Sequence, residues 1–207
     1  MKTLVAVLLA VCTLLFSAAL GLAVIHVTGF PFTVDVDYLD ITGTSGLTRT
    51  EIFENYDAVM AYLSPLSSAD LALPTLGWTE VSTGHFADVK YVFNALYLLG
   101  AVSALILLLL TKCRAATREV LRLSGGLTLL VPAIIGGAVA VQFDRAFELF
   151  HAIFFAGDTW LLDPQKDEII KILPSTFFLH CALFIAAFWV IAAAIQFARA
   201  YTGKNKY

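Results

Sequence analysis

Charged side chains are scarce in this chain of 207 residues. Asp, Glu, Lys and Arg together make up 14% of it, hydrophobic residues make up 59%, and the mean hydropathy is +0.84. Because a soluble domain of this length has a far more polar composition, the scarcity of charge excludes that class. The composition predicts an integral membrane protein.

Cysteine and several reactive motifs are also scarce or missing. The three cysteines, Cys12, Cys113 and Cys181, lie in or beside apolar runs, which excludes an extracellular disulfide framework and an outward thiol nucleophile. No basic block interleaved with aromatic residues is present, so nucleic acid is excluded as a partner. The chain has no HExxH motif and no Cys/His cluster, and Ser82 lacks a GxSxG elbow. We therefore expect no metal and no serine nucleophile.

What is abundant is apolar sequence, in four runs that can each cross a bilayer as a helix of about 20 residues. They are Leu4–Val27, Val89–Thr111, Leu123–Val141 and Thr176–Ala198. The first run, of about 24 residues, exceeds the apolar core of a signal peptide and is interpreted as a retained anchor. We expect spanning helices at 1–27, 88–111, 123–142 and 176–198, an extracytoplasmic cap at 28–87, an extracytoplasmic interfacial segment at 143–175, a cytoplasmic loop at 112–122 and a cytoplasmic tail at 199–207.

The distribution of charge predicts which side each segment faces. Eight of the 13 Lys and Arg residues lie at the N-terminus, in 112–122 or in 199–207, beside the single acid Glu119. By the positive-inside rule these parts are cytoplasmic, as are both termini. The parts between 28 and 90 and between 142 and 175 hold the other fifteen acids and should face outward.

The cap is predicted to be a small α+β structure on an all-α membrane protein. Apolar and polar residues alternate from Phe32 to Tyr38, which is typical of a half-buried strand. Thr48 and Glu51 form a capping-box pattern, and apolar residues then recur at helical spacing, so we expect a helix to about Ser64.

After the third apolar run, aromatic residues recur at spacings of three and four from Phe143 to Phe154. Asp144, Glu148, His151 and Phe155 form a neighbouring stripe at the same spacing. We therefore expect the third spanning helix to continue beyond the hydrocarbon and to end at Gly157. A short interfacial helix is expected at Asp167–Leu173, before Pro174.

All four histidines lie near the predicted outer boundary, where a side chain that exchanges protons near pH 7 suits general-base chemistry. His151 is the strongest candidate, because Glu148 can hold one ring nitrogen and leave the other free; the alternative is a plain interfacial histidine bonded to a carbonyl or headgroup. His85 with Asp88 is the second candidate, in the first turns of a helix capped by Ser82 or Thr83.

Four further residues are supporting or substrate-binding candidates. His26 is interpreted mainly as an interfacial anchor, and His180 as a bundle histidine with its hydrogen bonds satisfied, although either can line the site. Arg145 either binds a phosphate or carboxylate, or snorkels to the interface. Trp160 fits an aromatic belt better than a substrate platform.

These motifs resemble a bacterial four-span membrane family that includes the lipoprotein intramolecular transacylase, Lit. The resemblance rests on FHxxFF from Phe150, DxW from Asp158, DPxxD from Asp163, PxxFF from Pro174 and HxxDVK from His85. It extends over the whole chain in layout: an anchor, an outer cap and three further spans.

The resemblance implies an enzyme on the outer face of a Gram-positive cell membrane. Such an enzyme moves the sn-2 acyl chain of a diacylglyceryl lipoprotein to the α-amine of its N-terminal cysteine, giving lyso-form lipoprotein by N-acylation. The family histidines correspond to His85 and His151. We expect His151 to take the amine proton and His85, oriented by Asp88, to stabilise the oxyanion and protonate the leaving oxygen, with the roles open to reversal.

The expected partners are the lipoprotein substrate and membrane lipid, and no cofactor is expected, because ester-to-amide exchange runs downhill. Two other readings stay open from the sequence. The chain can be a non-catalytic membrane scaffold or chaperone, or a metal-dependent membrane hydrolase.

Overall fold

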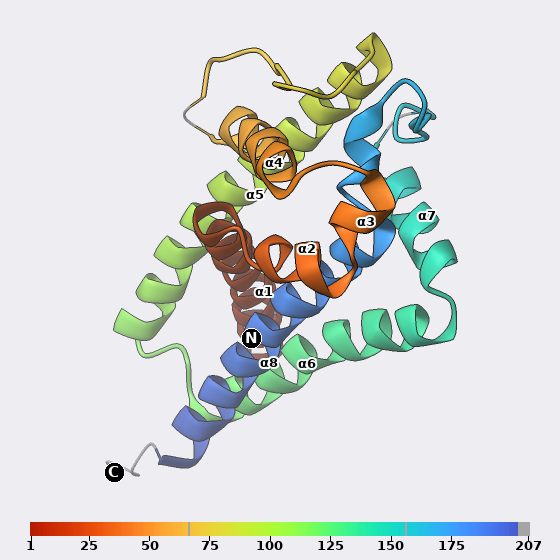
Figure 1. The fold of residues 1–207 in the computed structure, drawn as a ribbon. Coiled ribbons are helices and arrows are strands. Elements are labelled where there is room, and N and C mark those ends of the chain that lie inside the picture. The colour runs from red at the N-terminus through yellow and green to blue at the C-terminus, as the bar shows by residue number, and fades with distance from the viewer. Residues whose placement is uncertain (66, 156, 203–207) are drawn as a thin grey trace. The chain divides into compact units, whose positions relative to one another are not determined.

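The computed structural model describes residues 1–65, 67–155 and 157–202, and these residues form helices and no strand. The predicted tail at 199–207, with Lys204 and Lys206, lies partly outside them. The elements are α1 (Lys2–Thr28), α2 (Phe32–Tyr38), α3 (Ile41–Ser45), α4 (Arg49–Leu63), α5 (Glu80–Lys112), α6 (Arg118–Val141), α7 (Phe143–Phe154), the 3₁₀-helix η1 (Glu168–Lys171) and α8 (Ser175–Thr202) (Figure 1).

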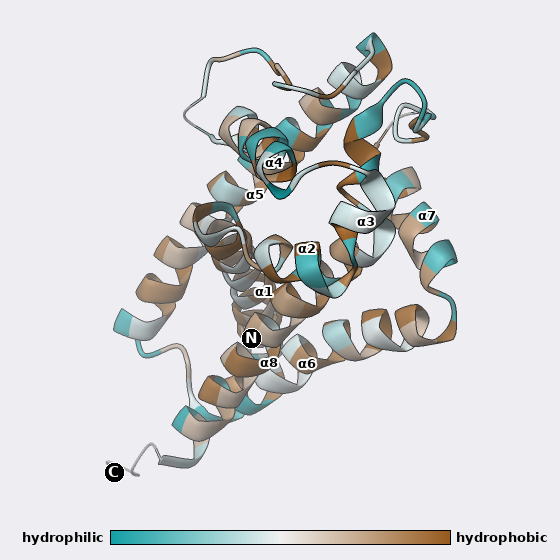
Figure 2. Ribbon diagram, viewed as in Figure 1, coloured by the Kyte–Doolittle hydropathy of each residue, from teal (hydrophilic) through white to brown (hydrophobic). Residues whose placement is uncertain are grey.

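Four of these helices are long and apolar enough to cross a membrane, namely α1, α5, α6 and α8. They have 27, 33, 24 and 28 residues, and the lipid core requires about 20. Figure 2 shows hydrophilic residues on α2, α4 and α7, whereas most of α6 and of α8 is pale to brown. The fold is therefore all-helical with four candidate membrane spans.

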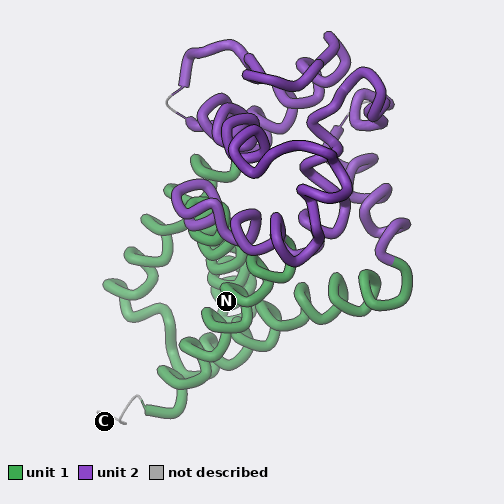
Figure 3. Tube along the Cα trace, in the orientation of Figure 1, with its two compact units in different colours: residues 1–23, 96–142, 182–207 green, residues 24–95, 143–181 purple. Residues whose placement is uncertain are grey.

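The chain forms two compact units, coloured separately in Figure 3. Unit 1 comprises residues 1–23, 96–142 and 182–207, and unit 2 comprises 24–95 and 143–181. Unit 1 holds most of the apolar helical sequence. Unit 2 holds all four histidines.

Unit 1 is held together by close helix contacts and by a few polar bonds. A Cβ added at Gly100 would lie 2.4 Å from the Cβ of Ala19, so α1 and α5 approach at a distance that only glycine permits there. The Gln196 amide donates to the Thr13 hydroxyl at 2.7 Å, a bond worth more to the fold where water is absent.

Unit 2 has its own aromatic and aliphatic core. Phe32 stacks on Tyr56 with ring centroids 3.8 Å apart, and Phe177 meets Phe32 edge to face at 5.6 Å. Ile52 and Ile169 complete this core with no exposed surface. These contacts join α2, α4, η1 and the start of α8, so they fix the surroundings in which the histidines lie.

The predicted strand at Phe32–Tyr38 is wrong, because this segment forms helix α2. The buried residues of this helix are Phe32, Asp35 and Val36, which occupy positions i, i+3 and i+4 on one helical face. Val34 and Tyr38 are exposed. The alternating pattern therefore does not match burial, and no second strand exists among the described residues to pair with it. The cap is helical, not α+β.

The helix expected after Thr48 is confirmed as α4, and its capping box is present. The Thr48 hydroxyl accepts from the Glu51 amide at 3.3 Å, and the Glu51 carboxylate accepts from the Thr48 amide at 2.8 Å. The helix ends at Leu63, close to the expected Ser64.

The expected continuous helix from the third span through Phe154 is wrong. It is interrupted at Gln142, whose φ of −159° and ψ of 88° are extended. The Gln142 amide still bonds to Ala138, which closes α6, and the chain restarts as α7 at Phe143. The break falls where the sequence changes from uniformly apolar to amphipathic.

Candidate active site

Two helices of unit 2 each present one histidine, and the two rings lie close together. His85 lies in the second turn of α5, and His151 in the last turn of α7. Their ring centroids are 6.0 Å apart, and each residue is almost buried, at 9% and 8% exposure. The structure thus brings together the two histidines that were the strongest candidates in the sequence.

His151 is held in one tautomer by the backbone of its own helix. Its Nδ1 lies 2.8 Å from the carbonyl oxygen of Phe147, one turn earlier. A carbonyl only accepts hydrogen bonds, so Nδ1 carries the hydrogen, and in the neutral ring Nε2 holds the lone pair. Nε2 is then the position at which this ring can accept a proton.

The expected hydrogen bond from Glu148 to His151 is not formed. Glu148 is exposed, and its carboxylate takes part in no hydrogen bond within the described ranges. The carbonyl of Phe147 takes the place that was expected for the carboxylate, because a ring at position i reaches the i−4 carbonyl of its own helix directly. His151 is oriented by the fold without a buried charge.

Aromatic rings surround His151 on several sides. Trp160 stacks on it with centroids 4.7 Å apart and an interplanar angle of 30°, and Phe147 lies at 4.2 Å. Phe155 lies 5.4 Å from His151 and 4.9 Å from His85, so it bridges the pair.

Burial lowers the pKa of His151 from its ordinary value of 6.5, and the bond to Phe147 opposes this shift only in part. The ring is therefore a neutral base near pH 7.

His85 has one ring nitrogen without a partner. Its Nδ1 is buried, and it makes no hydrogen bond within the described part of the chain. Asp88, which was expected to orient this ring, is exposed and does not bond to it. A buried polar atom without a partner costs stability, and a bond from a substrate to this nitrogen would remove that cost.

The start of α5 is formed by residues other than those expected. Thr79 precedes the helix, and its hydroxyl accepts from the amides of Val81 and Ser82 at 3.2 and 3.4 Å. Thr79 is therefore the cap, and the expectation of Ser82 or Thr83 is wrong. Asp167 in turn accepts from the Thr79 amide and hydroxyl.

Of the other supporting candidates, the two histidines have structural contacts of their own, whereas the arginine has none among the described residues. His26 forms a hydrogen bond with the backbone of Met60 on α4. His180 pairs with Asp35 of α2 through Nδ1 and Oδ1 at 2.7 Å. Arg145 is exposed on α7, and it has no ion pair in the ranges that the structure describes.

Sequence reasoning missed three residues around the pair: Phe155, Thr79 and Asp167. Phe155 lies on the same helical stripe as His151, four residues on, and this spacing was the available signal. Asp167 belongs to the DPxxD motif, but nothing in the sequence linked it to Thr79.

No group of three or more His, Cys, Asp or Glu side chains in the described ranges is arranged to hold a metal ion.

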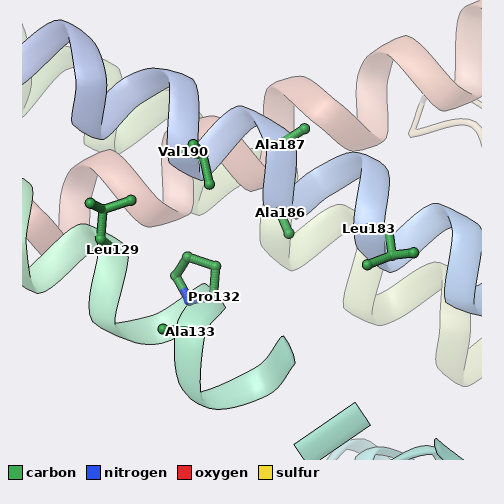
Figure 4. Close-up of a pocket in the computed structure, with 7 residues that line it drawn as sticks. All are labelled: Leu129, Pro132, Ala133, Leu183, Ala186, Ala187 and Val190. Carbon is green, nitrogen blue, oxygen red and sulfur yellow. The ribbon is translucent and has the colours of Figure 1, made fainter. Parts of the chain in front are cut away.

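A separate apolar groove of about 510 Å³ occurs in unit 1 (Figure 4). It lies between α6 and α8 and carries no ionisable side chain; its lining residues are Leu129, Pro132, Ala133, Leu183, Ala186, Ala187 and Val190.

Comparisons with known proteins agree on one family. The model of the family described as lipoprotein intramolecular transacylase Lit matches residues 4–178. The in meso structure of the membrane-integral lipoprotein intramolecular transacylase Lit from Bacillus cereus is 28% identical, with a TM-score of 0.87 over 96% of this chain and 93% of that one. Structures of that Bacillus cereus protein with an H85R or an H85A mutation are each 27% identical with a TM-score of 0.82, over 97% of this chain and 91% or 92% of theirs. No curated protein matches the chain.

Proposed function

The chain belongs to the Lit family of lipoprotein intramolecular transacylases, and we propose that it performs that family's reaction with the side chains of His85 and His151. The reaction moves the sn-2 acyl chain of a diacylglyceryl lipoprotein to the α-amine of the same molecule's N-terminal cysteine. A nitrogen–carbon bond forms, the ester carbon–oxygen bond breaks, and one proton passes from the amine to the glyceryl oxygen.

The proton transfer is assigned to Nε2 of His151. The attacking α-amine has a reference pKa near 8 and must lose a proton to form the amide. Nε2 is unprotonated in the neutral tautomer that the Phe147 carbonyl selects, so it can accept this proton. Burial keeps the ring neutral at the working pH.

The same nitrogen returns the proton to the leaving group. If His85 supplied it instead, a neutral imidazole would have to become an anion, which is far less favourable. A single shuttle at Nε2 of His151 leaves both histidines neutral at the end of the cycle. The assignment therefore differs from the sequence expectation, in which His85 protonated the leaving oxygen.

His85 is assigned to the oxyanion that develops on the ester carbonyl. Its ring lies 6.0 Å from that of His151, so both rings can contact one reacting carbon held between them. The unpartnered, buried Nδ1 makes this ring the available polar group for the substrate. A preorganised donor at such a position is worth about 10²–10³ in rate.

The aromatic residues around the pair serve to exclude water. Trp160, Phe147 and Phe155 cover the histidine rings, and water admitted there would hydrolyse the ester in place of transfer to the amine. Because nucleophile and ester belong to one substrate molecule, positioning them lowers the barrier by several kcal/mol, on the order of the effective-molarity effect.

The site is placed on the outer face of the membrane, with both termini in the cytoplasm. Lys2 and the cations concentrated in 112–122 and 199–207 support this orientation, as does the acidic character of the segments in unit 2. Membrane lipid borders the four helices. The orientation is tested by introducing single cysteines at exposed positions such as Asp70 and Arg118 and labelling intact cells with a membrane-impermeant thiol reagent. Position 70 should react, and position 118 should not.

The observation that carries the assignment is the paired, nearly buried arrangement of His85 and His151. Its test is mass spectrometry of lipoprotein N-termini from a host that lacks a transacylase, with and without the wild-type chain, H85A and H151A. Lyso-form lipoprotein should appear only with the wild type. A wild-type chain that leaves the lipoproteins diacylated would refute the function and favour a scaffold or chaperone, and full activity in either variant would refute the site. Loss of activity with a chelator would favour the metal-dependent hydrolase.

A further inference from the structure

One buried carboxylate outside the histidine pair joins the start of α5, which carries His85, to the segment that follows Trp160. Asp167 is 3% exposed and lies between the turn after Trp160 and the helix η1. Its Oδ1 accepts from the Thr79 amide at 3.0 Å and from the Thr79 hydroxyl at 2.6 Å. Thr79 is the residue that caps α5, the helix of His85.

The neighbouring residue strengthens this connection with a reciprocal pair of bonds. The Glu168 amide donates to the Gly77 carbonyl at 3.0 Å, and the Glu168 carboxylate accepts from the Gly77 amide at 2.9 Å. We refer to Gly77, Thr79, Asp167 and Glu168 as the junction. All of its members belong to unit 2.

On one side, the junction fixes the start of α5. Ser82 follows Thr79 by three residues, has no exposed surface, and its amide bonds to the Thr79 hydroxyl. His85 follows Ser82 by a further three residues, on the same side of the helix. A shift of Thr79 would therefore move the ring of His85.

On the other side, the junction fixes the segment that carries Trp160. The Asp167 amide donates to the Asp163 carbonyl at 2.7 Å, which closes the turn between Trp160 and η1. Ile169 anchors η1 in the core with no exposed surface. Trp160 is stacked on His151, so this segment determines one wall around that ring.

We propose that Asp167 is a positioning residue, which through Thr79 and Ser82 sets the place of His85 relative to His151 and Trp160. The inference rests on the proposed function, because it concerns the same pair of histidines. It gives a role to the acid that ends the DPxxD motif, which makes no contact with the rings themselves among those described.

The chemistry of the junction favours an ionised carboxylate. Burial alone would raise the pKa of Asp167, but hydrogen bonds from Thr79, Ser82 and the backbone amides outweigh it and lower the pKa overall. A carboxylate also accepts two bonds from one residue at a single oxygen, and it lies at the positive end of a 33-residue helix.

The test compares four single variants and one double variant of the full chain in detergent, with lyso-form lipopeptide measured by mass spectrometry. D167A removes the acceptor, T79V removes the hydroxyl and keeps the side-chain shape, and D167N keeps the oxygen that accepts. D163N is the matched control, because Asp163 lies in the same turn and its side chain bonds to Gln165 and Lys166 and to no other group that the structure describes.

We expect D167A and T79V to lower kcat by up to about 10²-fold with KM nearly unchanged, since a misplacement of about 1 Å has that effect. D167N should recover most of the loss, and D163N should match the wild type. D167A/T79V together should fall short of the product of the two single losses, since both break the bond between the Thr79 hydroxyl and Asp167. The unfolding temperature of each variant is measured beside its activity, and if D167A unfolds, T79V and D167N decide the question.

Wild-type kcat in both D167A and T79V would overturn the positioning role while leaving the proposed function standing. An inactive D167N beside a fully active T79V would also overturn it, because it would show that the charge acts directly. A wild-type chain that forms no lyso-form product refutes the proposed function itself, and the positioning role fails with it.

Discussion

The hydrogen-bonded pair of Asp35 and His180 gives an asymmetric prediction about stability. Asp35 is 2% exposed, its Oδ1 contacts His180, and its Oδ2 has no partner among the described groups. The His180 side chain is 26% exposed and can hydrate if the partner is lost. Removing the histidine should therefore lower the free energy of unfolding by more than neutralising the acid does.

The expected magnitudes follow from which group is left behind. H180A leaves a carboxylate buried without a counter-charge, and breaking a buried pair in this way costs about 3–5 kcal/mol. D35N keeps the shape and an accepting oxygen, so it should cost about 1 kcal/mol. In the double variant, D35N removes the stranded charge and should restore about 1–3 kcal/mol relative to H180A alone.

The assay is thermal unfolding in detergent, followed with a thiol-reactive dye. Cys12 is buried and Cys181 is half-buried, so both report unfolding, whereas the exposed Cys113 reacts at the start. For a chain of this length each kcal/mol corresponds to about 2–4 °C, so H180A should unfold about 6–20 °C below the wild type. Equal effects of D35N and H180A, with the double variant at their sum, would refute the reasoning.

Three further outcomes can be measured with the same preparations. E148Q should retain activity within about twofold, since that carboxylate is exposed and does not bond to His151, and a loss beyond tenfold would contradict the placement of the ring. Because burial lowers the pKa of His151 below 6.5, the ring stays neutral on acidification, and its titration, followed by NMR of isotope-labelled histidine, should have a midpoint below pH 6.5; a midpoint at or above 6.5 would refute the burial argument. T48A should lower the unfolding free energy by about 1 kcal/mol through loss of the α4 cap, with T50A as the control at a position that does not cap, and equal unfolding temperatures for the two would contradict it.

The sequence predicted those features that depend on local pattern. Four long apolar runs require four long helices, and the Thr48 and Glu51 pair required a helix start, because each signal lies within one element. The two leading histidines were also found from local pattern, since each lies among residues of unusual type for its place in the chain.

The features that the sequence did not predict depend on contacts between distant segments. At Phe32–Tyr38 the alternation favoured a strand, but Asp35 turns inward because His180, far along the chain, is there to pair with it. The predicted hydrogen-bond partners of the two site histidines were wrong for the same reason. Acids three residues away in sequence, Glu148 and Asp88, were assigned to the histidines, whereas the acid that bears on α5 is Asp167, which meets it only in the folded unit.

The four histidines share a predicted depth in the membrane, yet their hydrogen bonds divide them into two kinds. His26 and His180 bond to groups that belong to the fold, a backbone group on α4 and a buried carboxylate on α2. His151 bonds to its own helix through Nδ1, which leaves Nε2 as its second ring nitrogen. His85 has a buried Nδ1 that bonds to no group in the described residues. A nitrogen that the fold leaves without a partner is a cost to stability, and its retention in a nearly buried ring is explained when a substrate supplies the missing bond. By this criterion we assign the proposed chemistry to His85 and His151, whereas the other two histidines bond to the helices around them.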